Sequence, residues 1–165
     1  MERTDDNERF PSRKHPRLKN FDYSSPNYYF ITICTWNKNC IFGKPNELNQ
    51  WGNIAENDLL EIEHHFSGVK IDKYVVMPNH VHAILRISLR DGEADNAQRS
   101  SLGIVIGGLK REVKLFAKRR CLQFAWHTRY HDHIIRGATD GNNIANYIRT
   151  NVERWGEDCF NRMEG

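Results

Sequence analysis

The sequence has no apolar run of the length that crosses a membrane, and its first residues lack the hydrophobic core of a signal peptide. We therefore expect a cytoplasmic protein without a membrane partner. No nucleotide-binding loop is present, so nothing in the sequence indicates a dependence on ATP. No internal repeat is visible, and 165 residues with a charged fraction of 27% are typical of one soluble globular domain.

The sequence has few cysteines and only a small net charge. The cysteines form no Cys-x-x-Cys pair, which argues against a zinc ribbon or a thioredoxin-type site; they are Cys34, Cys40, Cys121 and Cys159. We expect them to be reduced and to serve as small hydrophobic residues. A formal net charge of +3 permits binding to nucleic acid without requiring it, so the distribution of the basic residues matters more than their sum.

Basic residues are concentrated near the start of the chain. We expect residues 1–24 to form a basic N-terminal arm and residues 25–165 to form a single folded domain. The cations of the arm that we single out are Arg13, Lys14, Arg17 and Lys19. Composition alone leaves two interpretations open: a solvated disordered tail, or an arm that becomes ordered along a phosphate backbone.

Hydrophobic periodicity predicts four strands and three helices in the domain. Alternating or β-branched segments indicate strands at 28–36, 69–77, 80–88 and 124–136, and apolar residues at helical spacing indicate helices at 49–66, 101–120 and 143–155. The first six elements match a ferredoxin-like βαββαβ antiparallel sheet of the α+β class, with its two helices on one face. The last helix is an addition that carries Tyr147.

Two histidines lie two residues apart in the third predicted strand. Side chains alternate along a strand, so His80 and His82 share a face, about 6.6–7 Å apart along the backbone. Two imidazoles at that spacing can converge on one metal ion. Val81 points the other way, toward the core, and the histidine face lies away from the first two helices.

The last predicted helix offers the remaining groups of a metal site. Asn151 could supply an amide oxygen, and Tyr147, one turn earlier, lies on the same helix face. Two imidazoles and one amide oxygen leave positions open for phosphate oxygens and water. Such a mixed nitrogen and oxygen site suits Mn²⁺ or Mg²⁺, with the histidines favouring Mn²⁺.

A second pair of histidines has the same spacing around an acidic residue. An aspartate on the core side of a strand would be costly to bury, so the segment from His131 to His133 is not expected to be the primary metal pair. We expect Asp132 and His133 to lie at a sheet edge or to orient the site from outside.

The second predicted helix carries a stripe of one charge, formed by Lys110, Lys114 and Lys118. A charged stripe is usually a solvated helix face. Cations of one sign repel one another unless an anion neutralises them, which favours contact with phosphate. Both interpretations remain open.

These features resemble the REP-associated tyrosine transposases, within the HUH family of single-strand DNA transposases and nickases. The resemblance extends over residues 20–155, and its most specific part is the Met-Pro-Asn-His-Val-His block followed by Tyr-Ile-x-x-Asn. The segments that carry it are Tyr29–Thr35, Val75–His82, Ser101–Gly103, Trp126, Tyr130, Asp132–Arg136, Tyr147-Ile148 and Asn151. The chain has Val152 where the family usually has proline, and His127 where glutamine is common; neither change removes a reacting group.

The resemblance implies a transposase that cleaves single-stranded DNA through a 5′-phosphotyrosine. It makes His80, His82 and Asn151 the metal ligands and Tyr147 the nucleophile. It implies hairpin-forming, REP-like DNA as the partner, and it favours DNA binding by the N-terminal arm. The protein would act as a monomer or a homodimer.

Two other functions are compatible with the same elements. One is a catalytically silent protein that binds DNA hairpins. The other is a ferredoxin-like RNA-binding module, in which strand aromatics stack on bases and no metal is needed.

Overall fold

The computed structural model describes residues 18–88, 101–158, 160 and 161. Three cations of the basic arm, Arg13, Lys14 and Arg17, lie outside the described residues, as do the polar segment 91–100 and Cys159. Among the residues that are described, no helix has both the length and the apolar character needed to span a membrane.

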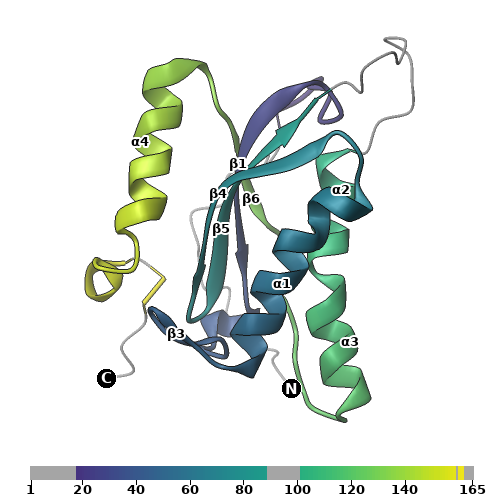
Figure 1. Cartoon of the computed structure of the whole chain (residues 1–165), viewed down its shortest axis with the longest axis vertical. Coiled ribbons are helices and arrows are strands. Elements are labelled where there is room, and N and C mark those ends of the chain that lie inside the picture. The colour runs from purple at the N-terminus through teal and green to yellow at the C-terminus, as the bar shows by residue number, and fades with distance from the viewer. Residues whose placement is uncertain (1–17, 89–100, 159, 162–165) are drawn as a thin grey trace, which may run out of the picture.

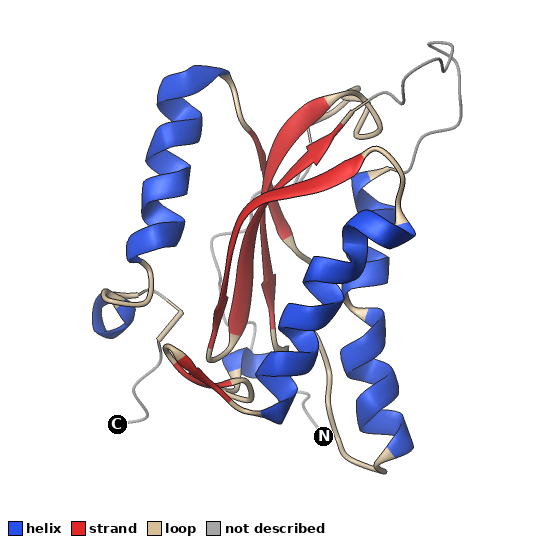
Figure 2. Ribbon diagram, viewed as in Figure 1, coloured by secondary structure: helices blue, strands red, loops and turns tan. Residues whose placement is uncertain are grey.

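A four-stranded antiparallel sheet forms the middle layer, in the spatial order β4-β5-β1-β6 (Figure 1, Figure 2). Its strands are β1 (Asn27–Cys34), β4 (Val69–Met77), β5 (His80–Ile87) and β6 (His131–Ile134). A short hairpin, β2 (Gly43–Lys44) and β3 (Glu47–Leu48), lies outside this sheet. The central strands β5 and β1 pair over their whole length, with His80 opposite Cys34 and His82 opposite Thr32.

Helices cover the two faces of the sheet separately (Figure 1). One face carries α1 (Gln50–His65), α2 (Leu102–Leu109) and α3 (Arg111–Arg119), and the other carries α4 (Gly137–Thr150). Two single-turn 3-10 helices follow β1 and α4: η1 (Trp36–Lys38) and η2 (Trp155–Glu157). The predicted α+β, ferredoxin-like arrangement with an added C-terminal helix is confirmed.

The main core lies between the sheet and helices α1 and α2. Alternate β5 side chains, including Val81, Ala83 and Leu85, are buried there with Leu59 and Ile106 from the helices. Each Å² of apolar surface buried on this face stabilises the fold by roughly 25 cal/mol. The opposite face of β5 is therefore free to carry polar side chains without weakening that core.

The first turn of α1 is capped by Asn49. The Asn49 side chain accepts hydrogen bonds from the backbone N–H groups of Trp51 and Gly52, which satisfies two free donors of the first turn. The turn that leads from α1 into β4 requires glycine at position 68, where φ is +76° and an added Cβ would lie 2.6 Å from the Ser88 carbonyl oxygen.

Three predicted elements have wrong boundaries, among them the last helix, which ends at Thr150 and not at residue 155. The predicted helix 101–120 is divided at Lys110 into α2 and α3, because the Trp126 indole donates to the Lys110 carbonyl. The last helix begins at Gly137, six residues earlier than predicted, with Asp140 accepting from the Arg136 backbone N–H. The last strand contains only His131–Ile134; the chain before it forms an isolated bridge between Trp126 and Thr35, just beyond the end of β1.

Candidate metal centre and tyrosine site

Two histidines are buried side by side at the start of β5. His80 is 0% and His82 is 1% exposed, and their ring centroids lie 4.4 Å apart. Strand alternation turns both rings toward the α4 side of the sheet, while Val81 between them packs in the core. The structure therefore places the pair on one face, as the sequence predicts.

Both imidazoles are neutral at ordinary pH. Burial is the main cause, and it lowers the pKa of His80 and of His82 to about 3. The Nδ1 atom of His80 lies 2.8 Å from Asn79 Oδ1, and the Nδ1 atom of His82 lies 2.8 Å from Thr32 Oγ1. With Nδ1 occupied on each ring, Nε2 is the atom that faces the space under α4, and neutral imidazole is the form that binds metals.

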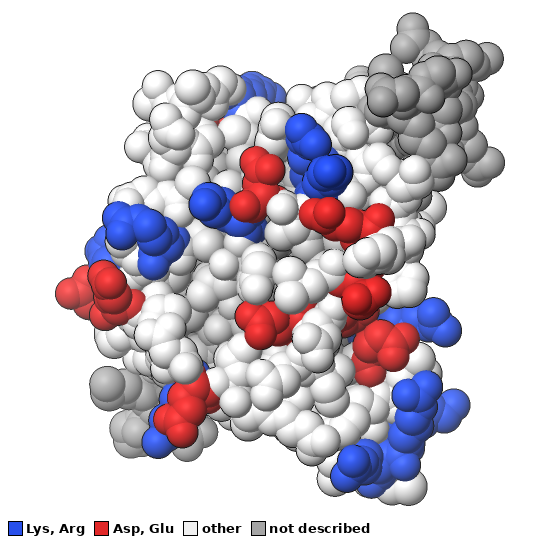
Figure 3. Space-filling view, in the orientation of Figure 1, with Lys and Arg blue, Asp and Glu red and all other residues white. Residues whose placement is uncertain are grey.

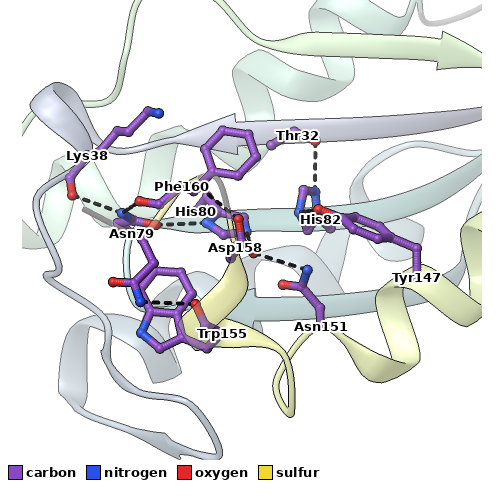
Figure 4. A network of polar contacts seen from close by, with 11 residues as sticks. Thr32, Lys38, Asn79, His80, His82, Tyr147, Asn151, Trp155, Asp158 and Phe160 are labelled. Carbon is purple, nitrogen blue, oxygen red and sulfur yellow. Dashed lines mark hydrogen bonds and ion pairs between the residues drawn. The ribbon is translucent and has the colours of Figure 1, made fainter. Parts of the chain in front are cut away.

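The end of α4 brings Tyr147 and Asn151 to the histidines (Figure 4). The Tyr147 hydroxyl lies 3.4 Å from His82 Nε2, and the tyrosine ring packs edge-on against His82 and Phe30. Asn151, one turn later, is 3% exposed. Tyr147 is 38% exposed as a residue, although its hydroxyl lies beside the buried His82.

A carboxylate that the sequence analysis missed completes the cluster. After α4 the chain turns through η2 and returns Asp158 to the histidines, with Oδ2 3.8 Å from His80 Nε2 and 3.2 Å from Asn151 Nδ2. One ligand atom from each of His80, His82 and Asp158 lies within 4.8 Å of the other two. No spacing in the sequence marks Asp158, because it lies outside any helix or strand that carries another ligand.

The donor set fits a divalent cation. Among the described residues, two buried side-chain atoms at this point have no hydrogen-bond partner, His80 Nε2 and Asn151 Oδ1. Leaving buried polar atoms unpaired costs roughly 1–3 kcal/mol each, unless another ligand satisfies them. A neutral nitrogen and an amide oxygen with free lone pairs, next to a carboxylate, are ligands of the kind that such a cation takes.

Comparison with known proteins places the chain in a family. No protein-family profile matches the sequence. A protein of Haemophilus influenzae, described as uncharacterized, is 33% identical over 164 residues, which cover 88% of this chain and 91% of the relative. The chain belongs to the same family as that protein.

The fold of this family member is that of a known transposase structure. The REP-associated tyrosine transposase bound to a REP hairpin superposes with a TM-score of 0.60 and 20% identity, over 85% of this chain and 74% of the other. This agrees with the fold that the sequence resemblance implies.

Aromatic rings close the histidine pair off from water. The Phe160 ring centroid lies 4.6 Å from the His80 ring centroid, and the Trp155 ring centroid lies 6.0 Å from it. The Lys38 ammonium is 4.9 Å from the centre of the Phe160 ring. These contacts explain why burial dominates the pKa of His80.

A groove of about 240 Å³ lies beside the cluster, on the side of α4 and η2. Its lining residues are Tyr147, Thr150, Asn151, Arg154, Glu157 and Asp158. Arg154 and Glu157 form an exposed ion pair of 3.3 Å at its rim. The groove gives a ligand access to Tyr147 and to the Asp158 side of the cluster.

The two residues expected to orient the site lie on different faces of β6. His133 pairs with Phe30 of β1, and its Nε2 lies 2.9 Å from the Asp140 carboxylate of α4, so it ties β6 to the helix that carries Tyr147. Asp132 pairs with Ile31, whose side chain lies in the helix-covered core, so Asp132 faces away from the histidines. Both residues lie on the edge strand β6, which is the first of the two expected placements, and strand alternation turns Asp132 away from the histidines.

The lysine stripe lies on the opposite side of the molecule from the histidines. Lys114 and Lys118 are exposed on α3, which covers the other face of the sheet. Figure 3 shows basic side chains gathered at the end of α3 and acidic ones over the middle of the same view. Lys110 is half-buried, and its Nζ donates to the His127 carbonyl at 2.8 Å, so it stabilises the break between α2 and α3. Lys19 is exposed near the first described residue.

Proposed function

We propose that this protein is a metal-dependent single-strand DNA endonuclease and strand transferase, a transposase that cleaves near hairpin-forming repeats through a 5′-phosphotyrosine intermediate. The observation that carries the proposal is the convergence of one tyrosine hydroxyl with four buried side chains that could ligate a metal. Tyr147 contributes the hydroxyl, and the ligating side chains are His80, His82, Asn151 and Asp158. Mn²⁺ or Mg²⁺ fits them, and the two imidazoles favour Mn²⁺.

The chain supplies a nucleophile and holds it in place. Tyr147 Oη attacks the phosphorus of a phosphodiester, forming the Tyr–O–P bond while the bond from phosphorus to the 3′-oxygen breaks. The phenol proton passes to solvent, and the departing 3′-oxygen takes a proton to become a free hydroxyl. When bound, a divalent cation neutralises the non-bridging phosphate oxygens that otherwise repel the nucleophile. The phosphotyrosine bond can be attacked by another 3′-hydroxyl, so strands can be rejoined without ATP.

All groups of the proposed site come from one chain. Tyr147 lies beside His82 of its own chain, so the site needs no residue from a second subunit. We propose that a monomer is sufficient for cleavage. Its DNA partner would be a hairpin, as in the transposase structure bound to a REP hairpin, with the basic N-terminal arm adding phosphate contacts. Chromosomal substrates of this kind would locate the protein in the cytoplasm.

The covering of the sheet argues against an RNA-binding module. Such a module stacks bases on aromatics of an open sheet face. Here α4 lies over that face, Phe30 packs against His82 and Tyr147, and Tyr29 is fully buried. The aromatic residues at the middle of β1 are therefore occupied by contacts within the protein.

The test is a hairpin-cleavage assay with the Tyr147→Phe variant in Mn²⁺. We expect the wild-type protein to form a covalent adduct with a single-stranded hairpin substrate, and chelation to abolish it. Tyr147→Phe should form no adduct while its hairpin affinity stays close to that of the wild type, because only the hydroxyl is removed. Tyr28→Phe is the matched control, since Tyr28 is an exposed tyrosine on β1 at the far end from the histidines.

Two results would contradict the proposal. A covalent adduct in Tyr147→Phe would show that another residue is the nucleophile. Tight hairpin binding by the wild-type protein with no adduct in Mn²⁺ or Mg²⁺ would identify a catalytically silent hairpin-binding protein instead.

A further inference from the structure

The side chain of Asn79 is buried between three segments of the chain, and its orientation is determined by two carbonyl groups. Its Nδ2 donates to the Lys38 carbonyl at 2.9 Å and to the Phe160 carbonyl at 2.8 Å, and the residue is 1% exposed. A carbonyl oxygen can only accept hydrogen bonds, so the NH₂ group must face these two atoms. The Oδ1 atom of Asn79 is thereby directed to the opposite side.

The oriented amide oxygen decides where His80 carries its proton. Asn79 Oδ1 lies 2.8 Å from His80 Nδ1. Because an amide oxygen has no proton to donate, Nδ1 must be the protonated nitrogen of this neutral imidazole. Its Nε2 then holds a free lone pair, and Figure 4 shows this ring between Asn79 on one side and Asp158 on the other. Within the described chain, His80 Nε2 is buried without a hydrogen-bond partner.

The neighbouring histidine has no such constraint from its own partner. Thr32 Oγ1 lies 2.8 Å from His82 Nδ1, but a hydroxyl can donate as well as accept. Thr32 is therefore compatible with either tautomer of His82. The contacts of His80 Nδ1 and His82 Nδ1 are equally long, but only the contact of His80 determines the tautomer of its ring.

We propose that Asn79 is a positioning residue that holds His80 in the Nδ1–H tautomer, so that Nε2 is ready to bind the metal before the metal arrives. This inference rests on the proposed function, since it concerns the same metal site. Without the amide oxygen, the imidazole can place its proton on Nε2, where it blocks coordination. The hydrogen bonds from Asn79 to the Lys38 and Phe160 carbonyls contribute to holding this tautomer, because they prevent the amide from turning its NH₂ group toward the His80 ring.

The experiment reads the tautomer directly in the metal-free protein. Long-range ¹H–¹⁵N correlation spectra of the imidazoles distinguish Nδ1–H from Nε2–H, and isothermal titration with Mn²⁺ gives the affinity of the same samples. Wild-type His80 should be in the Nδ1–H form. Asn79→Ala should move His80 wholly or partly to Nε2–H and weaken Mn²⁺ binding by roughly 10- to 100-fold, the effect typical of losing an outer partner of a ligating histidine.

Two further variants separate tautomer control from simple anchoring. Asn79→Asp keeps an oxygen that accepts from His80 Nδ1 but cannot donate to Lys38 or Phe160, so at mildly alkaline pH it should retain the Nδ1–H form and most of the Mn²⁺ affinity. Thr32→Val removes the matching partner of His82 and should leave the tautomer of His80 unchanged.

The inference is overturned if wild-type His80 is in the Nε2–H form, if Asn79→Ala keeps Nδ1–H, or if Asn79→Asp loses the tautomer and the affinity as fully as alanine does. The last result would assign Asn79 to anchoring alone. Because the spectra need neither DNA nor metal, these results stay distinct from a failure of the DNA cleavage test.

Discussion

Asp158 supplies the negative charge among the four ligating side chains of the proposed site. The other three, His80, His82 and Asn151, are neutral, and burial keeps both imidazoles uncharged because it lowers the pKa of each to about 3. A divalent cation placed among neutral ligands alone would have its charge poorly compensated in a site that excludes water. The carboxylate should therefore contribute strongly to the affinity for metal.

We predict that Asp158→Asn weakens Mn²⁺ binding by about 10-fold or more, as measured by isothermal titration. The amide has nearly the same shape but can accept only one of the two hydrogen bonds that the carboxylate takes from Asn151 Nδ2 and the Phe160 backbone N–H, so the loss would reflect the removed charge together with one lost hydrogen bond. Glu157→Gln is the control, because Glu157 is the adjacent acidic residue and pairs with Arg154 at the surface. An affinity for Asp158→Asn within two-fold of wild type would show that this carboxylate is not a ligand.

Among the elements, the packing of α1 against α2 and α3 contains two features that can be tested through stability. Asp58 of α1 is 6% exposed, and burial raises the pKa of its carboxyl to about 7; its Oδ2 accepts from the Glu112 backbone N–H at 3.4 Å. At the other end of the interface, Gly108 of α2 lies against the Phe66 ring at the end of α1. Neither feature touches the proposed metal site.

We predict that Asp58→Asn stabilises the protein at neutral and alkaline pH. The folded pKa is about 7 and the unfolded value is near 3.8, so the folded state binds more protons between these values and loses stability as pH rises through that window. The variant has no such loss, and its free energy of unfolding should exceed the wild-type value by about 1–3 kcal/mol above pH 7. Urea unfolding at several pH values measures this.

The difference should shrink as pH falls toward 4, because the wild-type carboxyl is then protonated in the folded state. Asp72→Asn is the control, since Asp72 is an exposed aspartate on β4. A pH-independent difference between Asp58→Asn and wild type would mean that Asp58 is ionised in the folded protein throughout this range.

We predict opposite effects for alanine at two neighbouring glycines of α2. An added Cβ at Gly108 would lie 2.7 Å from Phe66 Cε2, so Gly108→Ala should destabilise by about 1–2 kcal/mol despite its better helix propensity. Gly107 is exposed, and no atom lies within 4 Å of a Cβ built there, so Gly107→Ala should stabilise by about 0.5–1 kcal/mol. Equal shifts of the urea midpoint in both variants would rule out close packing of Phe66 on Gly108.

At the scale of the whole molecule, the proposed metal and tyrosine site and the lysine stripe lie on opposite sides of the sheet. The histidines lie on the face of the sheet that α4 covers, whereas α3, which carries the exposed Lys114 and Lys118, lies on the other side of the sheet (Figure 1). A short single strand bound at Tyr147 has no need to reach them. A folded hairpin is wider, and its phosphates can extend around the protein.

We predict that Lys114→Gln combined with Lys118→Gln leaves the cleavage rate of a short unstructured strand unchanged and weakens hairpin binding. Each lost phosphate contact should make the slope of log affinity against log salt shallower by about 1. Lys70→Gln with Lys73→Gln, on the exposed edge strand β4, serves as the control. An unaltered slope for the α3 pair would assign the stripe to an ordinary solvated face.

The sequence by itself determined the elements that carry the site. A strand repeats its side-chain direction every two residues, so His80 and His82 had to share a face. A helix brings residues four apart onto one side, so Tyr147 and Asn151 had to lie together. Both rules act within one element, and the order of the elements was sufficient to indicate the ferredoxin-like sheet.

Only the tertiary structure decided which other groups lie beside the two histidines, Tyr147 and Asn151. Asp158 reaches the histidines because the chain turns back after α4, and no local periodicity encodes that return. The helix break at Lys110 comes from a hydrogen bond to Trp126, sixteen residues later. The orientation of Asn79 depends on carbonyls 41 residues before it and 81 residues after it. These contacts join segments that local sequence rules treat separately, so only the packed chain determines them.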